Sequence, residues 1–203
     1  MRAFIYVGGD IRIDAIEEFP TEEDLVIAAD SGYANALALG VAPTVVLGDF
    51  DSLGYKPDNA VSYKCVKDFT DGEGAVEQVK DFATEIEFYN FGGGREDHFY
   101  GNLSLLIKAE GLGIKARAIT NTCEIYYVTN CISLDNVKNK TVTIAPFGDE
   151  AHILKGEGLA YSVDNIKLSC DKTLGVSNIA TEERLELKLK SGKIFVFVVK
   201  ETV

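Results

Sequence analysis

Two aspartates at alternate positions after a short apolar run are the first residues in this sequence whose spacing suggests chemistry. The apolar run 45–47 is followed by Gly48, and then by Asp49 and Asp51. Such a run is typical of a buried parallel strand, and open α/β sheets bind ligands outside the carboxyl ends of these strands. Side chains two residues apart in extended backbone lie on the same side, so this pair can hold a hard cation such as Mg²⁺. The alternative is a polar loop whose aspartates bond to local backbone groups, and both interpretations stay open for this pair.

Two more aspartates lie where predicted helices begin. Asp30 follows a predicted strand over 25–29 and precedes a short predicted helix over 33–40. Asp71 lies inside a capping-box sequence, Thr70-x-x-Glu73, in a first helical turn where the helix dipole favours a carboxylate. Each acid has a structural explanation at a helix start, and Asp30 could cap its helix while also lining a site.

A glycine run between a predicted strand and a predicted helix indicates anion binding. Glycines 92–94 follow the strand 86–91 and precede Arg95, Asp97 and His98. Backbone N–H groups in this layout can bind an anion, although no Gly-Lys-Ser/Thr closes the run as in a P-loop. We expect Arg95 to contact phosphate oxygens and Asp97 to cap the helix or to position a ligand. For His98, a single histidine without a second one nearby in the motif, we expect a role as a hydrogen-bonding partner rather than as a proton shuttle.

The order of predicted elements favours an α/β unit followed by an all-β unit. Strands and helices alternate up to about Thr120, and the first strand ends at Gly8-Gly9, which favours a plain turn over a phosphate contact. We predict a Rossmann-like, mostly parallel sheet in residues 1–120 and an all-β sandwich or roll in residues 121–203. The remaining strands are predicted over 3–7, 60–66, 116–120, 124–129, 131–134, 141–145, 158–163, 185–190 and 194–199.

The composition is that of an ordinary globular protein with an acidic balance. The chain has 203 residues, 46% of them hydrophobic and 26% charged, and a formal net charge of −12. This balance excludes a uniform basic surface for nucleic acid. The four cysteines are scattered without a C-x-x-C pair, which favours reduced thiols over a zinc site. No apolar run has the length of a membrane span and no signal peptide is visible, so we expect a cytoplasmic protein without membrane contact.

Taken in order, the motifs resemble those of the thiamine pyrophosphokinase family. The family's G-D-F-D-S stands as residues 48–52, its K-D-x-T-D as 67–71, its G-G-R-x-D-H as 93–98 and its N-L-S-L-L as 102–106. Residues 29–37 resemble its A-D-G-G-A-N-x-L segment, and 158–161 and 175–178 resemble its G-L-x-Y and G-x-S-N motifs. The resemblance spans nearly the whole chain, and the order and spacing of the earlier motifs are specific.

The resemblance implies an α/β catalytic domain, a C-terminal β domain that contributes to thiamine binding, and a homodimer with sites between subunits. The implied reaction is ATP + thiamine → AMP + thiamine diphosphate, with Mg²⁺ as cofactor and ATP as co-substrate. By resemblance, Asp49, Asp51 and Asp71 bind Mg²⁺, and Asp71, Arg95 and Asp97 have catalytic roles. Contacts to the nucleotide or to thiamine are implied for a further set: Asp30, Asn35, Arg95, His98, Asn102, Ser177 and Asn178.

Two other functions are compatible with the same acidic residues. A Mg²⁺-dependent nucleotide pyrophosphohydrolase would use them with water as the attacking group. A catalytically inactive regulatory module would bind nucleotide without forming a product. The intact set Asp49, Asp51, Asp71, Arg95 and Asp97 favours an enzyme, because a binding module needs no full metal complement. The group that accepts the thiamine hydroxyl proton stays open between Asp71 and Asp97.

Overall fold

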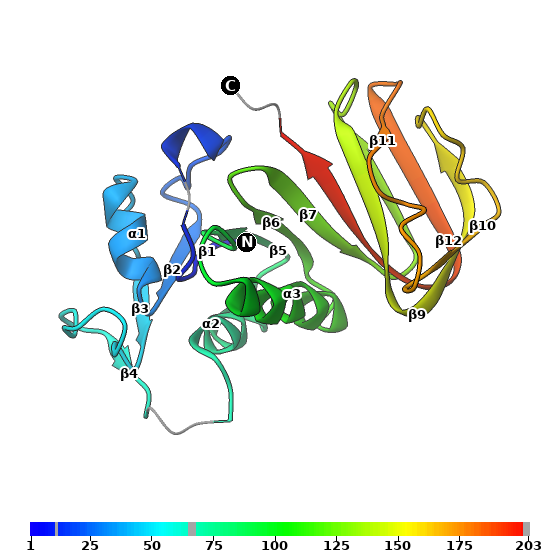
Figure 1. The fold of residues 1–203 in the computed structure, drawn as a ribbon. Coiled ribbons are helices and arrows are strands. Elements are labelled where there is room, and N and C mark those ends of the chain that lie inside the picture. Colours follow the sequence, from blue (N-terminus) through cyan, green and yellow to red (C-terminus); the bar gives the residue numbers. More distant parts are fainter. Residues whose placement is uncertain (11, 65–67, 201–203) are drawn as a thin grey trace. The chain divides into compact units, whose positions relative to one another are not determined.

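The computed structural model describes residues 1–10, 12–64 and 68–200, and it divides into two compact units. The first unit is Met1–Asn121 and the second is Thr122–Val203. Helices occur in the first unit, whereas the described part of the second contains strands and turns (Figure 1). The prediction of a sheet-rich chain in which an α/β part precedes a β part is therefore confirmed.

The first unit is built on a parallel sheet. Its strands are ordered β6-β5-β1-β2-β3-β4, and each neighbouring pair is parallel. The central strands are apolar on both faces, as strands covered by helices must be, and four of the five β1 residues are buried. Loops at the carboxyl ends of these strands therefore meet along one edge. The bounds are β1 Arg2–Tyr6, β2 Leu25–Ala29, β3 Val45–Gly48, β4 Val61–Ser62, β5 Glu85–Tyr89 and β6 Lys115–Ile119.

Helices cover both faces of this sheet. On one face Ala36 of α1 joins a buried cluster with Phe4, Tyr6 and Tyr89. The opposite face carries α2 and α3, which contact each other, and the first turn of α2 lies against Val7. Because successive strand residues alternate between faces, Tyr6 and Val7 point to opposite helix layers. The bounds are η1 Ile13–Ala15, α1 Gly32–Ala38, α2 Asp71–Val79 and α3 Glu96–Gly111.

The second unit is organised around two long antiparallel strands. Strand β12 pairs with β9 along most of its length, and its two halves also pair with β8 and β7. Strand β9 pairs in addition with β10 and β11. Alternate apolar residues of these strands form one buried cluster, which includes Ile144, Leu187 and Val196. The bounds are β7 Cys123–Val128, β8 Cys131–Asp135, β9 Thr141–Glu157, β10 Ile166–Ser169, β11 Asn178–Ile179 and β12 Arg184–Val199.

Several predicted strands differ from the observed ones. The predicted strands 185–190 and 194–199 are one strand, because the polar segment between them forms register shifts rather than a turn. Strand β9 continues far beyond Ala145, since pairing with β12 overrides its turn-like composition. The predicted strand 158–163 is wrong: Gly158 has φ 86° and only Leu159 forms an isolated bridge. Of the predicted strand 60–66, β4 occupies two residues, and residues 65 and 66 lie outside the described part.

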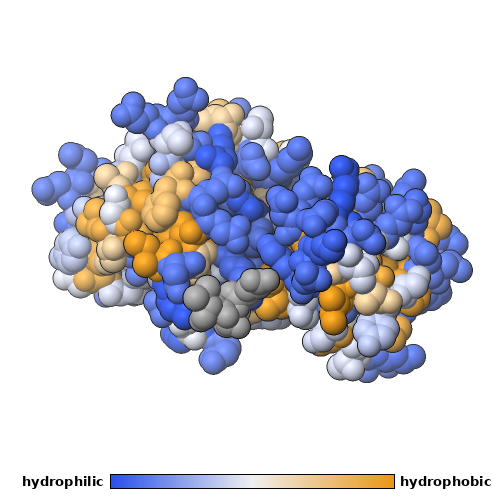
Figure 2. Space-filling model, turned by 90° about the horizontal axis from the view of Figure 1, so that it is seen from above, coloured by the Kyte–Doolittle hydropathy of each residue, from blue (hydrophilic) through white to orange (hydrophobic). Residues whose placement is uncertain are grey.

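Hydrophilic residues cover most of the surface in the view of Figure 2, and apolar residues gather in separate patches. This agrees with the acidic composition of the chain. None of the described helices is long and apolar enough to cross a membrane. The Rossmann-like character of the first unit and the sandwich or roll geometry of the second stay predictions.

Candidate active site

A cavity of about 780 Å³ lies at the carboxyl edge of the parallel sheet. Loops that follow β1, β2, β3 and β5 line it, together with the first residues of α2 and α3. This is the edge at which open α/β sheets bind ligands. Its lining includes five aspartates and one arginine from the predicted set: Asp30, Asp49, Asp51, Asp71, Asp97 and Arg95.

Three of these aspartates form a compact acidic cluster. Asp30, Asp49 and Asp51 each offer a carboxylate oxygen, and these oxygens all lie within 4.8 Å of one another. The parallel pairing of β2 with β3 explains the proximity, because it places the two strand ends side by side. The backbone N–H of Asp30 donates to the carbonyl of Leu47 at 2.8 Å and fixes the register there.

The backbone of this cluster is unusual. Asp30 and Phe50 have φ values of 49° and 62°, in the left-handed region that non-glycine residues rarely adopt. Gly48 approaches the backbone of Asp30 so closely that an added Cβ would lie 3.1 Å from its Cα. The chain therefore turns sharply after β3 rather than continuing as a strand, and this turn brings Asp49 and Asp51 toward Asp30.

The donor set of the acidic cluster fits a hard divalent cation. Oδ1 of Asp30 is buried and has no hydrogen-bond partner among the residues that the structure describes. A buried carboxylate oxygen without a partner is costly, and three carboxylates this close repel one another unless a cation lies between them. Three oxygen ligands at one sheet edge are a donor set that Mg²⁺ accepts.

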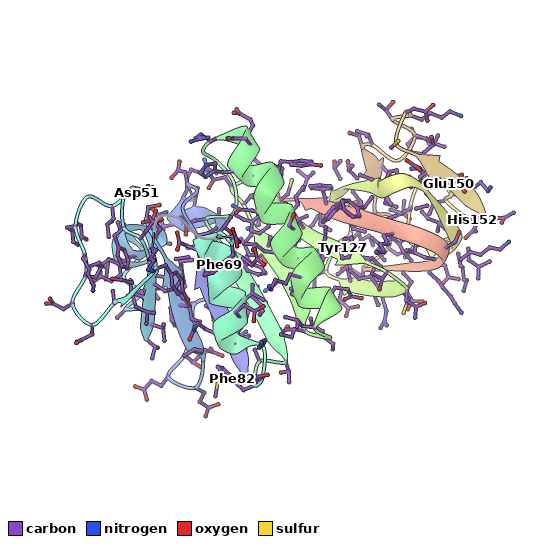
Figure 3. The ribbon with its side chains drawn as sticks, turned by 90° about the horizontal axis from the view of Figure 1, so that it is seen from below. Asp51, Phe69, Phe82, Tyr127, Glu150 and His152 are labelled. Carbon is purple, nitrogen blue, oxygen red and sulfur yellow. The ribbon has the colours of Figure 1, made fainter. Side chains whose placement is uncertain are left out.

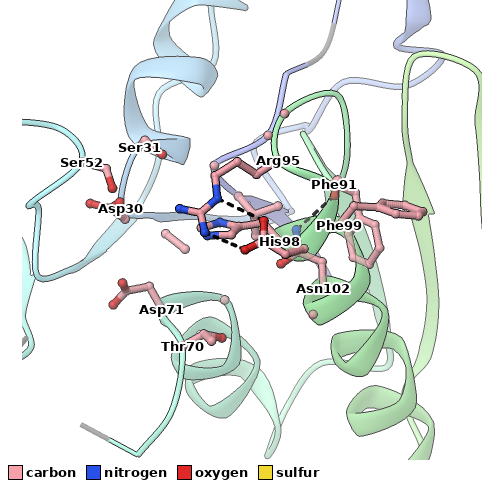
Figure 4. A pocket seen from close by; sticks show the side chains of 18 of the residues that line it. Asp30, Ser31, Ser52, Thr70, Asp71, Phe91, Arg95, His98, Phe99 and Asn102 are labelled. Carbon is pink, nitrogen blue, oxygen red and sulfur yellow. Dashed lines mark hydrogen bonds and ion pairs between the residues drawn. The ribbon is translucent and has the colours of Figure 1, made fainter. Parts of the chain in front are cut away.

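Asp71 lines the same cavity from another element. It is the first residue of α2, and Figure 4 shows its side chain across the cavity from Asp30. Sequence reasoning grouped Asp71 with Asp49 and Asp51 and placed Asp30 nearby, whereas the compact cluster contains Asp30. Asp51 and Phe69, which both line the cavity, are labelled in Figure 3. Lys67, the first residue of the motif that contains Asp71, lies outside the described residues.

Two glycine loops form another part of the cavity wall. The N–H of Gly9 donates to the carbonyl of Asn90 and that of Asp10 to Gly92, each at 2.8 Å, so the loops after β1 and β5 pair with each other. Within the described chain, the N–H groups of Gly8, Gly93 and Gly94 donate no hydrogen bond, and Gly8 and Gly94 line the cavity. The interpretation of Gly8-Gly9 as a plain turn missed this contact, because the pairing partners lie 81 and 82 residues further along the chain.

Two predicted ligand-binding asparagines hold these loops. The side-chain amide of Asn35 donates to the carbonyls of Val7 and Gly9, at 3.2 and 2.7 Å. The amide of Asn102 donates to the carbonyl of Phe91 at 3.0 Å (Figure 4). Asn35 belongs to α1 and Asn102 to α3, so these hydrogen bonds join both helices to the loops that line the cavity.

Arg95 and Asp97 are paired with each other. Nε of Arg95 donates to Oδ1 of Asp97 at 3.0 Å, and a terminal nitrogen donates to Oδ2 at 2.6 Å (Figure 4). The guanidinium holds the pKa of Asp97 at about 2, and Asp97 raises the pKa of Arg95. Arg95 occupies the N-cap position of α3 and its side chain makes no capping hydrogen bond, so Asp97 lies within the first turn rather than at the cap. His98 follows in the first turn and lines the cavity.

Ser177 and Asn178 belong to the second unit. Asn178 is 7% exposed, and its amide bonds to the backbone of the chain: Oδ1 accepts from the N–H groups of Tyr161 and Ile179, and Nδ2 donates to the carbonyl of Tyr161. Ser177 is exposed and has a φ of 59°. Asn178 therefore fixes the segment at Tyr161, while the Ser177 side chain reaches solvent.

Comparison with known proteins supplies independent information about both units. The family model described as "Thiamin pyrophosphokinase, catalytic domain" matches residues 16–118, and "Thiamin pyrophosphokinase, vitamin B1 binding domain" matches residues 129–194. A thiamine pyrophosphokinase of Bacillus subtilis (strain 168) is 29% identical over 200 residues, covering 93% of this chain and 94% of the relative. Thiamin pyrophosphokinase 1 of Caenorhabditis elegans is 30% identical over 167 residues, covering 75% of this chain and 69% of the relative.

Solved structures show the same fold. A crystal structure of thiamine pyrophosphokinase from Bacillus subtilis superposes with a TM-score of 0.86 at 24% identity and covers all of both chains. Thiamin pyrophosphokinase from Candida albicans superposes with a TM-score of 0.82 at 16% identity, covering 98% of this chain and 89% of the other. The matched family models span most of both units, and the chain belongs to the thiamin pyrophosphokinase family.

Proposed function

We propose that this protein transfers the pyrophosphoryl group of ATP to the hydroxyl of thiamine, giving thiamine diphosphate and AMP. The observation that carries the proposal is the meeting of an acidic cluster and two glycine loops in one cavity, in a chain of the thiamin pyrophosphokinase family. The thiamine hydroxyl oxygen forms a bond to the β-phosphorus, and the bond from that phosphorus to the α-phosphate oxygen breaks. AMP leaves with the electron pair of the broken bond.

The acidic cluster would hold Mg²⁺. Asp49 and Asp51 are its predicted ligands, and the proximity of Asp30 adds a third carboxylate. Asp71, which sequence reasoning also assigned to the metal, lines the same cavity. When bound, Mg²⁺ neutralises charge on the triphosphate. Without a cation, five aspartates in the cavity wall would repel that substrate.

The remaining groups of the cavity would bind and orient phosphate. The N–H groups of Gly8 and Gly94, which line the cavity, would donate to phosphate oxygens. The start of α3 has no side-chain cap, and an anion is favoured at a helix N-terminus. Arg95 supplies a delocalised cation with donors beyond the two that Asp97 uses. Asp97 or Asp71 would accept the proton from the thiamine hydroxyl, and His98 would be a hydrogen-bonding neighbour.

The second unit would supply the thiamine site. This proposal rests on the vitamin B1 binding match over residues 129–194 and on the segment that Asn178 fixes at Tyr161. Ser177, exposed beside that segment, is the residue we expect to contact thiamine or the nucleotide. A homodimer with sites between subunits and a cytoplasmic location are further expectations of the same proposal.

One assay tests the reaction. The purified chain is mixed with ATP, Mg²⁺ and thiamine, and AMP and thiamine diphosphate are quantified together; we expect equal amounts of both. AMP and pyrophosphate formed without thiamine would replace the proposal with a nucleotide pyrophosphohydrolase. Nucleotide binding with no product under any of these conditions would indicate a regulatory module.

A further inference from the structure

Lys108 of α3 bridges two carboxylates of α2. Its Nζ lies 2.9 Å from Oε1 of Glu73 and 2.6 Å from Oε1 of Glu77, and its side chain is 26% exposed. Neither Lys108 nor its two partners line the cavity. This contact therefore joins two helices outside the site rather than contributing a group to it.

Glu73 connects this bridge to the start of α2. Thr70 is the N-cap of the helix, and its Oγ1 accepts a hydrogen bond from the N–H of Glu73 at 3.2 Å. The capping-box sequence also predicts that the Glu73 side chain returns toward Thr70. Instead, that side chain extends to Lys108. The turn that begins with Asp71 is thus held by its own cap and by a charge on the neighbouring helix.

Close packing accompanies the ion pairs. A Cβ added to Gly72 would lie 2.9 Å from Cδ1 of Leu105, so the first turn of α2 approaches α3 tightly. Leu105 and Lys108 are three residues apart and therefore lie on one face of α3. The apolar contact and the charged contact are neighbours, and together they restrict both sliding and rotation of α2 on α3.

We propose that Lys108 is a positioning residue that fixes Asp71 of α2 relative to Arg95 and Asp97 at the start of α3. The proposal rests on the pyrophosphokinase function proposed above, because that function gives Asp71 and Arg95 a shared substrate. Two helices contribute separately to the cavity, and the Lys108 bridge joins them. Without it, the carboxylate of Asp71 moves away from the position that the triphosphate requires.

The chain offers a matched control for this proposal. Lys80 also contacts Glu77, at 2.9 Å, but it is the C-cap residue of α2 and does not bridge helices. Lys108→Met and Lys80→Met therefore remove the same charge and share one partner, while only the first removes the bridge. Lys108→Arg keeps the charge and can reach both carboxylates. Glu73→Gln removes only the ion pair between Lys108 and Glu73, the one nearer to the first turn of α2.

The measurements are kcat and KM for ATP and thiamine, the Mg²⁺ concentration for half-maximal rate, and the melting temperature. We expect Lys108→Met and Glu73→Gln to lower kcat or raise the Mg²⁺ requirement by about 10- to 100-fold. Lys80→Met should stay within about twofold of wild type, since exposed surface pairs contribute little, and Lys108→Arg should retain most activity. KM for thiamine should be unchanged throughout. A general loss of folded protein would also lower the apparent kcat without changing KM, so the Mg²⁺ requirement and the melting temperature are the readouts that distinguish it from a displaced Asp71.

Two outcomes would overturn the inference. One is that Lys108→Met and Lys80→Met have the same kcat and the same Mg²⁺ requirement. The other is that Lys108→Met has a lower melting temperature, while its kcat and Mg²⁺ requirement, measured well below that temperature, equal those of the wild type. Calorimetric titration of Mg²⁺ with a non-hydrolysable ATP analogue provides a readout that needs no turnover. If the wild type binds Mg²⁺ and analogue but makes no thiamine diphosphate, the proposed function fails, while the comparison of variants in this titration still tests Lys108.

Discussion

Arg95 and Asp97 form a two-point ion pair on the cavity wall, with nitrogen–oxygen distances of 3.0 and 2.6 Å. Both side chains are mostly exposed, at 71% and 64%, so the pair contributes little to stability. Its effect is geometric: Asp97 holds the planar guanidinium in one orientation and leaves its other N–H donors unoccupied by this carboxylate. An arginine oriented in this way is prepared to bind phosphate oxygens.

Replacing Arg95 with Ala should impair nucleotide use more than thiamine use. Loss of charge-assisted hydrogen bonds to phosphate predicts an increase in KM for ATP of about 10- to 100-fold, with KM for thiamine changed less than about threefold. Initial rates at varied concentrations of each substrate measure both constants. Arg12→Ala is the control, because Arg12 pairs with Asp14 at the same sequence spacing but does not line the cavity. A larger effect on thiamine than on ATP would contradict the phosphate role of Arg95.

Replacing Asp51 with Asn should remove turnover and leave the fold intact. The amide keeps the shape of the side chain but removes a negative charge from the acidic cluster, so Mg²⁺ binding weakens and kcat falls by at least about 100-fold. Circular dichroism checks the fold, and Mg²⁺-dependent thermal shift checks metal binding. Asp58→Asn, in an exposed loop outside the cavity, should behave like wild type. Near-normal turnover of the Asp51 variant would remove the metal assignment.

Replacing Gly9 with Ala should disrupt the paired glycine loops. The new Cβ would lie 2.2 Å from the carbonyl oxygen of Asn90 and 2.4 Å from that of Gly92, and neither backbone atom can move aside without breaking the loop pairing. We expect a loss of about 1–3 kcal/mol in unfolding free energy and weaker ATP binding, by analogy with overpacking. Gly111→Ala meets nothing within 4 Å and should be neutral or stabilising. Equal melting temperatures for the two variants would refute this account.

Replacing Asn178 with Ala should destabilise the second unit. It removes three hydrogen bonds to the backbone of Tyr161 and Ile179, for an expected loss of about 2–3 kcal/mol. Denaturant unfolding measures the loss, and thiamine binding should weaken with it because the segment at Tyr161 is no longer fixed. Ser177→Ala should leave stability unchanged, since that side chain is exposed. A stable Asn178 variant that has lost thiamine binding would show direct contact instead of positioning.

Glu87 should make stability depend on pH between about 4.5 and 7. Burial raises its pKa to about 7, although Arg117 lies 2.6 Å away and opposes the rise. Since the folded-state pKa exceeds the unfolded value, this contribution is fully present below pH 4.5 and is lost as the pH rises through 7. This rise in the pKa of Glu87 corresponds to at most about 3–4 kcal/mol of unfolding free energy.

Unfolding free energies measured across this range test the role of Glu87. Glu87→Gln should flatten the fall in stability with rising pH, while Glu85→Gln, exposed on the same strand, should keep it. Asp24 and Asp97 have pKa values of about 2 and affect stability only at lower pH, where protonation removes their ion pairs. An unchanged pH dependence in the Glu87 variant would show that other groups cause it.

Sequence reasoning located the site but not its internal geometry. Asp49 and Asp51 were expected to share a side through extended backbone, whereas Phe50 adopts a left-handed φ and the chain turns there. The partner of this pair, Asp30, depends on which strands are neighbours, and sheet order is not encoded in local spacing. The signal available was that Asp30 also follows a strand end.

The asparagines show a second limit. Asn35, Asn102 and Asn178 were assigned to ligands through their motifs, yet their amides bond to backbone carbonyls and N–H groups of the chain. Such bonds join segments far apart in sequence, so residue type and spacing cannot distinguish them from ligand contacts. Similarly, the length of β9 follows from its pairing with β12, and its local composition predicts a turn.

The left-handed backbone at Asp30 and Phe50 has a consequence for adaptation. Each residue in this conformation costs the fold about 1 kcal/mol or more. The backbone conformation that brings the three carboxylates together therefore lowers the stability of the loops that carry them. Selection for heat resistance alone should therefore favour glycine at position 50 or relaxed loops around position 30, and would erode the arrangement of carboxylates. Thermostable descendants of this chain that remain active would have to gain their stability elsewhere.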